Sequence, residues 1–113
     1  GEKENKYINS KESDIFKKGN LLYNYHRAKE FSRKQDEIII VEGPMDIIRA
    51  YTIGVKNCVA TLGTAFTKEQ AMLVRKLSSN VILCFDGDDA GLKATKGAIS
   101  ELTRLGIIPK IVI

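Results

Sequence analysis

A chain of 113 residues with 43% hydrophobic side chains is long enough for one domain with its own core, and too apolar for global disorder. Its net charge of +4 favours an anionic partner such as nucleic acid, and residues 1–36 carry most of the excess, with nine basic against six acidic side chains. No apolar run is long enough to span a membrane and no stretch resembles a signal peptide, so we expect a cytoplasmic protein without membrane contact.

The first half of the chain predicts a helix, a strand and a second helix after a polar leading segment. Residues 1–19 lack a clear hydrophobic period and are expected to be loop or extended chain. Residues 20–34 place apolar side chains at helical spacing, and residues 38–41, "IIIV", are typical of a strand buried on both faces. Pro44 fits the first turn of the next helix, which Gly54 is expected to end.

The second half continues the alternation of strands and helices. Strands are expected within residues 57–63, 81–85 and 110–113, and helices at 67–77 and about 90–105. Apolar strands that alternate with amphipathic helices predict an α/β fold. We therefore expect a mostly parallel, Rossmann-like sheet that is flanked by helices on both faces and preceded by a short irregular and helical segment.

The two cysteines, Cys58 and Cys84, fall in apolar runs far apart in the sequence. They have neither the spacing of a metal-binding pair nor the pattern of a secreted disulfide framework. We therefore expect both thiols to be reduced and buried.

Acidic residues stand directly after two of the expected strands. Glu42 follows the first strand, and Asp86 and Asp88 follow the third, in "VILCFDGDDAG". Ligands of open parallel sheets bind at the carboxyl ends of the strands, so three carboxylates converge if these strands are neighbours. Mg²⁺ between them would offset their repulsion, and such a cluster suits phosphoryl or nucleotidyl transfer. Nearby glycines allow tight turns and the close approach of a bulky anion: Gly43, Gly87 and Gly91.

The "DGDD" turn has other interpretations when it is taken alone. It is also typical of a solvated loop, or of a helix start that is capped by Asp88 or Asp89. A calcium-binding EF-hand loop is excluded, because Gly97 stands where that loop needs a glutamate. A phosphatase-type nucleophile motif remains open, although Ala90 stands where that motif usually has threonine or valine.

Several motifs in order carry a more specific resemblance. "VEGPMD" and "VILCFDGDDAG" resemble the two signature motifs of the TOPRIM domain of primases and topoisomerases. Together with "KYINSKESDIFKKG", "LYNYHRAKE" and "ATLGTAFTKEQ", they resemble the bacterial replicative DNA primases of DnaG type, from Lys6 to the end of the chain. The resemblance implies a DNA-directed RNA polymerase that uses Mg²⁺ or Mn²⁺ to make short RNA primers on single-stranded DNA from ribonucleoside triphosphates.

The resemblance also assigns roles to the acidic residues. It implies that Glu42, Asp86 and Asp88 are catalytic and bind the metal, and that Asp46, Gly43 and Gly87 support the site. Pro44 departs from the family, which often has an aromatic residue there.

The resemblance further implies that Lys6, Lys18 and Asn9 bind nucleotide or template. It divides the chain into the end of an N-terminal part of the primase core, residues 1–36, and a TOPRIM domain, residues 37–113, that stops before the family's third acidic motif. The isolated chain is therefore expected to be inactive or nearly so. We expect it to belong to a longer protein that binds the replicative helicase through another module.

Two other functions remain open at this stage. A non-catalytic TOPRIM module would bind nucleic acid or a partner regardless of metal, and a TOPRIM nuclease or topoisomerase would use the same acids for strand cleavage. The "KYINS" and "KKG" stretches argue against both, because they resemble the primases in particular.

Overall fold

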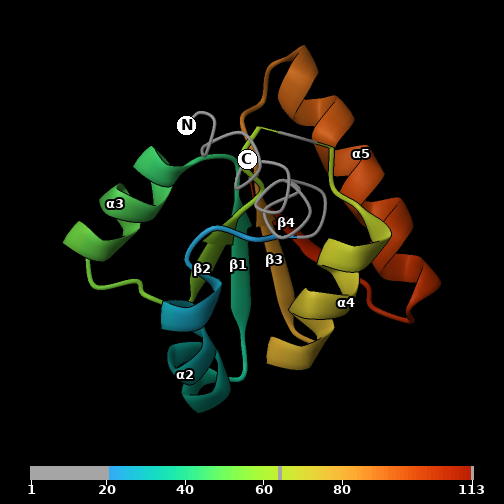
Figure 1. Cartoon of the computed structure of the whole chain (residues 1–113). Coiled ribbons are helices and arrows are strands. Elements are labelled where there is room, and N and C mark those ends of the chain that lie inside the picture. Colours follow the sequence, from blue (N-terminus) through green and yellow to red (C-terminus); the bar gives the residue numbers. More distant parts are fainter. Residues whose placement is uncertain (1–20, 64, 113) are drawn as a thin grey trace, which may run out of the picture.

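The computed structural model describes residues 21–63 and 65–112. Eight elements follow one another, as Figure 1 shows: α2 (Tyr25–Gln35), β1 (Ile38–Val41), α3 (Pro44–Thr52), β2 (Cys58–Ala60), α4 (Lys68–Leu77), β3 (Val81–Cys84), α5 (Asp89–Arg104) and β4 (Lys110–Val112).

The four strands form one sheet in the order β2-β1-β3-β4, and every neighbouring pair is parallel. In the centre of the sheet, Ile40 on β1 aligns with Val59 on β2 and with Leu83 on β3. The connections from β1 to α3 and from β3 to α5 leave the sheet at the same upper edge in Figure 1. The predicted parallel α/β fold is confirmed, and strands one and three are neighbours.

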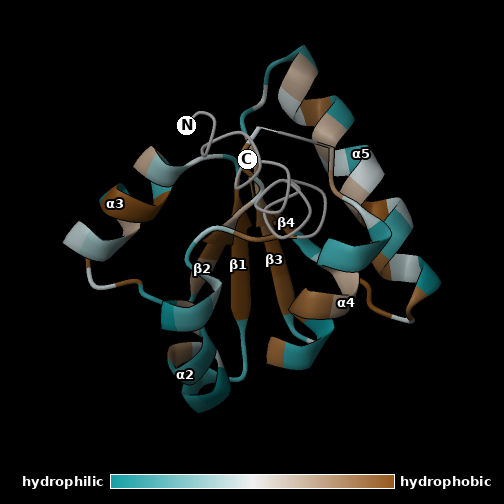
Figure 2. Cartoon of the chain, in the orientation of Figure 1, coloured by the Kyte–Doolittle hydropathy of each residue, from teal (hydrophilic) through white to brown (hydrophobic). Residues whose placement is uncertain are grey.

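Helices cover the two faces of the sheet unequally. On one face, α2, α4 and α5 pack around Ile40, Val59 and Leu83, which are fully buried. On the other face, Ile47 of α3 packs against Val41 and the short strand β2. Figure 1 shows α3 on one side of the sheet and α4 and α5 on the other, and Figure 2 shows that the strands are the most hydrophobic part.

The helix predicted at residues 20–34 begins later than expected. Asn24 adopts a left-handed backbone with φ of 71°, which a helix interior does not allow, and α2 starts after it. Tyr23 instead makes an antiparallel bridge to Ala60, through its N–H at 2.9 Å and its carbonyl at 3.2 Å. The Asn24 side chain donates to the Cys58 carbonyl at 3.1 Å, so this segment is fastened to the edge strand β2.

The other helix boundaries agree with the expected signals. Thr67 and Gln70 form the predicted capping box, with 3.0 Å between Thr67 Oγ1 and the Gln70 backbone nitrogen. Helix α3 begins at Pro44, and Gly54 follows its end with φ of 86°, a conformation that favours glycine. Within the described part of the chain, no helix has the length and apolar character needed to cross a membrane.

The expected burial of both cysteines is confirmed for Cys58 and wrong for Cys84, which is exposed. Side chains alternate along a strand, so Cys84 points away from the face on which its neighbour Leu83 is buried. Helix α3 packs mainly on β1 and β2 of that opposite face. The part of this face formed by β3 and β4 is left open, and Val112, aligned with Cys84, is also 48% exposed.

Candidate active site at the carboxyl edge of the sheet

Glu42 and Asp86 meet at the carboxyl edge of the sheet. Glu42 comes directly after β1, and Asp86 comes two residues after the end of β3, its parallel neighbour. The backbone N–H of Asp86 donates a hydrogen bond of 2.8 Å to Oε1 of Glu42. Two residues that are 44 positions apart in the sequence are thereby held together, as the sequence predicted for neighbouring strands.

Asp88 is the N-terminal cap of α5. Its Oδ1 accepts a hydrogen bond of 2.8 Å from the backbone N–H of Gly91. The capping interpretation of the "DGDD" turn is therefore confirmed for Asp88. The cap uses one carboxylate oxygen, and the side chain is exposed, so capping and metal binding are compatible.

The charges at this edge affect one another. The backbone N–H of Asp86 acts to lower the pKa of Glu42, because it stabilises the carboxylate. Partial burial and the charges of Asp86 and Asp88 outweigh this hydrogen bond, and the pKa of Glu42 lies above its usual value. The charges of both Asp86 and Asp88 therefore act on Glu42.

Hard divalent cations fit this set of oxygen donors. Mg²⁺ usually takes one or two carboxylates and completes its shell with water and substrate phosphates. No group of three or more acidic, histidine or cysteine side chains among residues 21–63 and 65–112 is arranged to hold a metal by itself. The half-buried Glu42 and the exposed Asp88 each use one carboxylate oxygen for a backbone amide, which leaves the other oxygen available for the open coordination that Mg²⁺ prefers.

Asp46 supports the loop that carries Glu42. Its Oδ2 accepts a hydrogen bond of 3.2 Å from the backbone N–H of Gly43, and its own N–H donates to the Gly43 carbonyl at 3.1 Å at the start of α3. Its Oδ1 lies 3.4 Å from Nη1 of Arg49. Gly43 itself has extended backbone and open space where a Cβ would stand, so local geometry does not require glycine there.

Of the remaining site residues predicted from the sequence, the structure describes only Gly87. Gly87 lies in the exposed bend between Asp86 and Asp88. Lys6, Asn9 and Lys18, the expected nucleotide- or template-binding residues, lie outside the described residues.

One residue beside the acids was not singled out from the sequence. Lys93 on α5 lines a cavity of about 290 Å³ together with Glu42, Thr61 and Phe66. The sequence offers one hint, because Lys93 lies four residues after Asp89, on the same face of the helix that follows the acidic turn. A lysine on a helix is common on any surface, which is why the pattern alone does not distinguish it.

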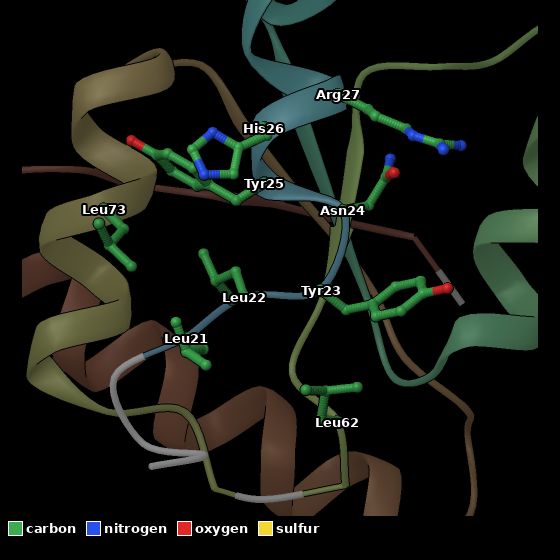
Figure 3. A pocket seen from close by; sticks show the side chains of 9 residues that line it. All are labelled: Leu21, Leu22, Tyr23, Asn24, Tyr25, His26, Arg27, Leu62 and Leu73. Carbon is green, nitrogen blue, oxygen red and sulfur yellow. The ribbon is translucent and has the colours of Figure 1, made fainter. Parts of the chain in front are cut away.

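A larger, mostly apolar cavity of about 740 Å³ lies elsewhere, and none of the three acids lines it. Figure 3 shows its walls, which come mainly from the segment that leads into α2, including Tyr23 and Tyr25, with Leu62 and Leu73 across from it. The rings of Tyr25 and His26 meet edge to face, with 6.0 Å between their centroids. Its described lining belongs to the packing of α2 on the domain, and among these residues there is no carboxylate for metal chemistry.

Comparison with known proteins places this arrangement in a family. Residues 39–113 match the family model described as Toprim-like, and residues 1–29 match the one described as DNA primase catalytic core, N-terminal domain. A DNA primase of Staphylococcus aureus (strain COL) is 48% identical over 104 residues, which are 92% of this chain and 17% of that protein. The chain thus spans about a sixth of the length of this curated relative.

Solved structures agree with the sequence comparison. The Aquifex aeolicus primase structure, with its zinc-binding and RNA polymerase domains, matches at TM-score 0.80 and 43% identity, over 87% of this chain and 24% of that one. A DnaG primase catalytic domain bound to single-stranded DNA matches at TM-score 0.70 and 36% identity, over 78% of this chain and 28% of that one. The chain therefore belongs to the Toprim-like family, among the bacterial DnaG-type DNA primases.

Proposed function

We propose that the chain is the TOPRIM-containing segment of a primase that makes short RNA primers on single-stranded DNA. In this reaction the 3′-hydroxyl of the primer attacks the α-phosphate of an incoming ribonucleotide and releases pyrophosphate. The observation that supports the proposal most is the hydrogen bond between Glu42 and Asp86 at the carboxyl edge of the sheet. The charge of Asp88 also acts on Glu42, and the fold resembles that of a solved primase.

The acidic residues have distinct roles in this proposal. Asp86 and Asp88 hold Mg²⁺ or Mn²⁺, and Glu42 binds the metal or accepts a proton. A bound divalent cation supplies charge that stabilises the attacking and leaving oxygens of the phosphoryl group. The backbone contacts of Glu42 and Asp88 orient these carboxylates before substrate arrives, which lowers the reorganisation needed for reaction.

The polar start of the chain completes the proposal. Lys6, Lys18 and Asn9 hold nucleotide or template, and residues 1–36 form the end of the N-terminal part of the core, before a TOPRIM domain at 37–113. Within the described residues, Lys93 is a further cation in the cavity beside Glu42. Because the relatives are several times longer, we infer that the isolated segment has little activity and that the helicase binds another module.

The test is a primer-synthesis assay on the full-length protein that contains this segment, with single-stranded DNA, ribonucleotides and Mg²⁺. Glu42→Gln and Asp88→Asn should each lose the short RNA products. Asp89→Asn is the matched control, because Asp89 directly follows Asp88 at the start of α5, is exposed and is not an expected metal ligand. It should synthesise primers like the wild type.

Other outcomes would assign another function. Cleaved DNA without RNA products would indicate a TOPRIM nuclease or topoisomerase. DNA binding that needs no metal and is the same in all variants, with neither product, would indicate a non-catalytic binding module. Robust primer synthesis by residues 1–113 alone would contradict the expected inactivity of the segment.

A further inference from the structure

Gly91 lies where helix α5 meets the acidic turn. It is the third residue of α5 and is buried, whereas Asp86, Gly87 and Asp88 before it are exposed. A Cβ built on Gly91 would overlap the carbonyl oxygen of Asp86, and would lie 2.6 Å from its carbonyl carbon and 3.1 Å from its Cα. All three contacts are with backbone, which has no side-chain rotation to relieve them.

Gly91 also binds the carboxylate of Asp88. Its N–H donates the 2.8 Å hydrogen bond to Oδ1 of Asp88, and the next amide, of Leu92, donates to the Asp88 carbonyl at 2.9 Å. The same residue therefore leaves no room for a Cβ beside the Asp86 backbone and binds the carboxylate of Asp88 through its amide. Glycine is needed here for close approach, since its φ is not in the left-handed range.

Another glycine of the same helix serves as a comparison. Gly97 is exposed on α5, and a Cβ built on it meets no atom within 4 Å. Both positions are helical, so alanine should improve helix propensity at each. Only at Gly91 does the added methyl group collide with the acidic turn.

We propose that Gly91 is a positioning residue, which sets the distance between helix α5 and the Asp86 backbone. In this way it keeps the carboxylates of Asp86, Asp88 and Glu42 placed to bind a divalent cation. This inference rests on the proposed function for the identity of the site. A side chain at Gly91 must push the Asp86 carbonyl away from the helix. Because Asp86 N–H is bonded to Glu42 and Gly91 N–H to Asp88, that displacement reaches all three acids.

The experiment compares Gly91→Ala and Gly97→Ala in the full-length protein. Mn²⁺ binding is followed by electron paramagnetic resonance, and Mg²⁺ titrations of primer synthesis give the concentration for half-maximal rate. We expect Gly91→Ala to weaken Mn²⁺ binding and raise the Mg²⁺ requirement by about 10–100-fold, the usual loss when groups that orient metal ligands are changed. Gly97 lines the cavity that also contains Glu42 and Lys93, so this variant is compared in Mn²⁺ binding alone, where it should match the wild type.

Folding is controlled in the same experiment. Gly91→Ala is also made in the Gly97→Ala background, where the better helix former supports α5. A folded Gly91→Ala protein with normal metal binding would overturn the proposal. So would a variant that stays unfolded in both backgrounds, because Gly91 would then be required for the fold rather than for the site. Recovery of synthesis at high Mg²⁺ supports positioning, since added metal does not restore an unfolded chain.

The two proposals fail in different ways. If the wild type binds Mn²⁺ but makes no primers, the proposed function is wrong, and the effect of Gly91→Ala on Mn²⁺ binding still tests the positioning role. If the wild type makes primers and Gly91→Ala leaves the metal requirement unchanged, the positioning role is wrong while the function stands.

Discussion

Acidic residues lie at both ends of the sheet, but with different partners. At the amino-terminal edge, the Asp36 carboxylate accepts hydrogen bonds from Ser78 Oγ at 3.0 Å and Asn80 Nδ2 at 3.3 Å. At the carboxyl edge, Glu42 accepts one backbone hydrogen bond, and the charges of two neighbouring aspartates act against its ionisation. One edge pairs a carboxylate with neutral donors, whereas the other gathers like charges.

The different partners of the acidic residues indicate that the amino-terminal edge contributes to stability, whereas the carboxyl edge serves function. Asp36 links the end of α2 to the turn before β3, so its hydrogen bonds contribute to folding. The carboxylates at the other edge repel one another until a cation binds, so their clustering costs stability. Such a cost is expected at a site that selection maintains for its chemistry.

The largest expected effect is at the carboxyl edge. Glu42→Gln should lower primer synthesis by roughly 100-fold or more, because a metal ligand or proton acceptor is lost. Its thermal midpoint should be equal to or higher than that of the wild type, since glutamine keeps the oxygen that accepts from Asp86 N–H and removes one like charge. Primer assays and thermal unfolding measure the two changes, and a clear fall in the midpoint would contradict the comparison.

The reverse pattern is expected at the amino-terminal edge. Asp36→Ala should lower the free energy of unfolding by about 1–3 kcal/mol, since Ser78 and Asn80 lose an acceptor and alanine tolerates the left-handed backbone poorly (φ of 51°). Asp36→Asn, which keeps one oxygen and tolerates that backbone, should lose less. Urea unfolding measures both, and Mn²⁺ affinity should be unchanged in each. Equal losses would show that the oxygen and the backbone tolerance that asparagine retains contribute little.

A smaller effect is expected in the pH dependence of stability. The pKa of Glu42 in the folded protein is above its ordinary value of 4.5, so the folded state binds more protons than the unfolded state just above pH 4.5. The contribution of Glu42 to stability is complete below that pH and is lost as the pH rises through the folded pKa. Unfolding curves without Mg²⁺ should show this loss, added Mg²⁺ should diminish it because the cation offsets the acidic charges, and Glu42→Gln should remove it. A stability that rises through this window because of Glu42 would disprove the assignment.

The smallest effect concerns the two thiols. Burial raises the pKa of Cys58 to about 11, and this thiol should not react with iodoacetamide in the folded protein. Partial burial, followed by the charges of Asp46 and Asp86, raises the pKa of the exposed Cys84. Asp86→Asn should therefore speed alkylation of Cys84 a few-fold, as measured by mass spectrometry. An unchanged rate would mean that the edge charge does not reach this thiol.

Local patterns in the sequence determined the elements and the candidate acids. Apolar runs of strand length, Pro44, and the Thr67 and Gln70 pair predicted the strands and helix starts, because these signals act within a few residues. Glu42, Asp86 and Asp88 were found because each follows a strand, and parallel strands end at one edge.

Contacts between distant residues decided the rest. Helix α2 starts later than predicted because Tyr23 pairs with Ala60. A hydrophobic period over neighbouring residues cannot predict this long-range pairing. Cys84 is exposed because helix α3 packs on β1 and β2 and does not cover β3 on the same face. The position of α3 on the sheet depends on tertiary packing. The strict need for glycine at position 91 arises from the carbonyl of Asp86 lying against the helix, and only the folded chain brings that carbonyl there.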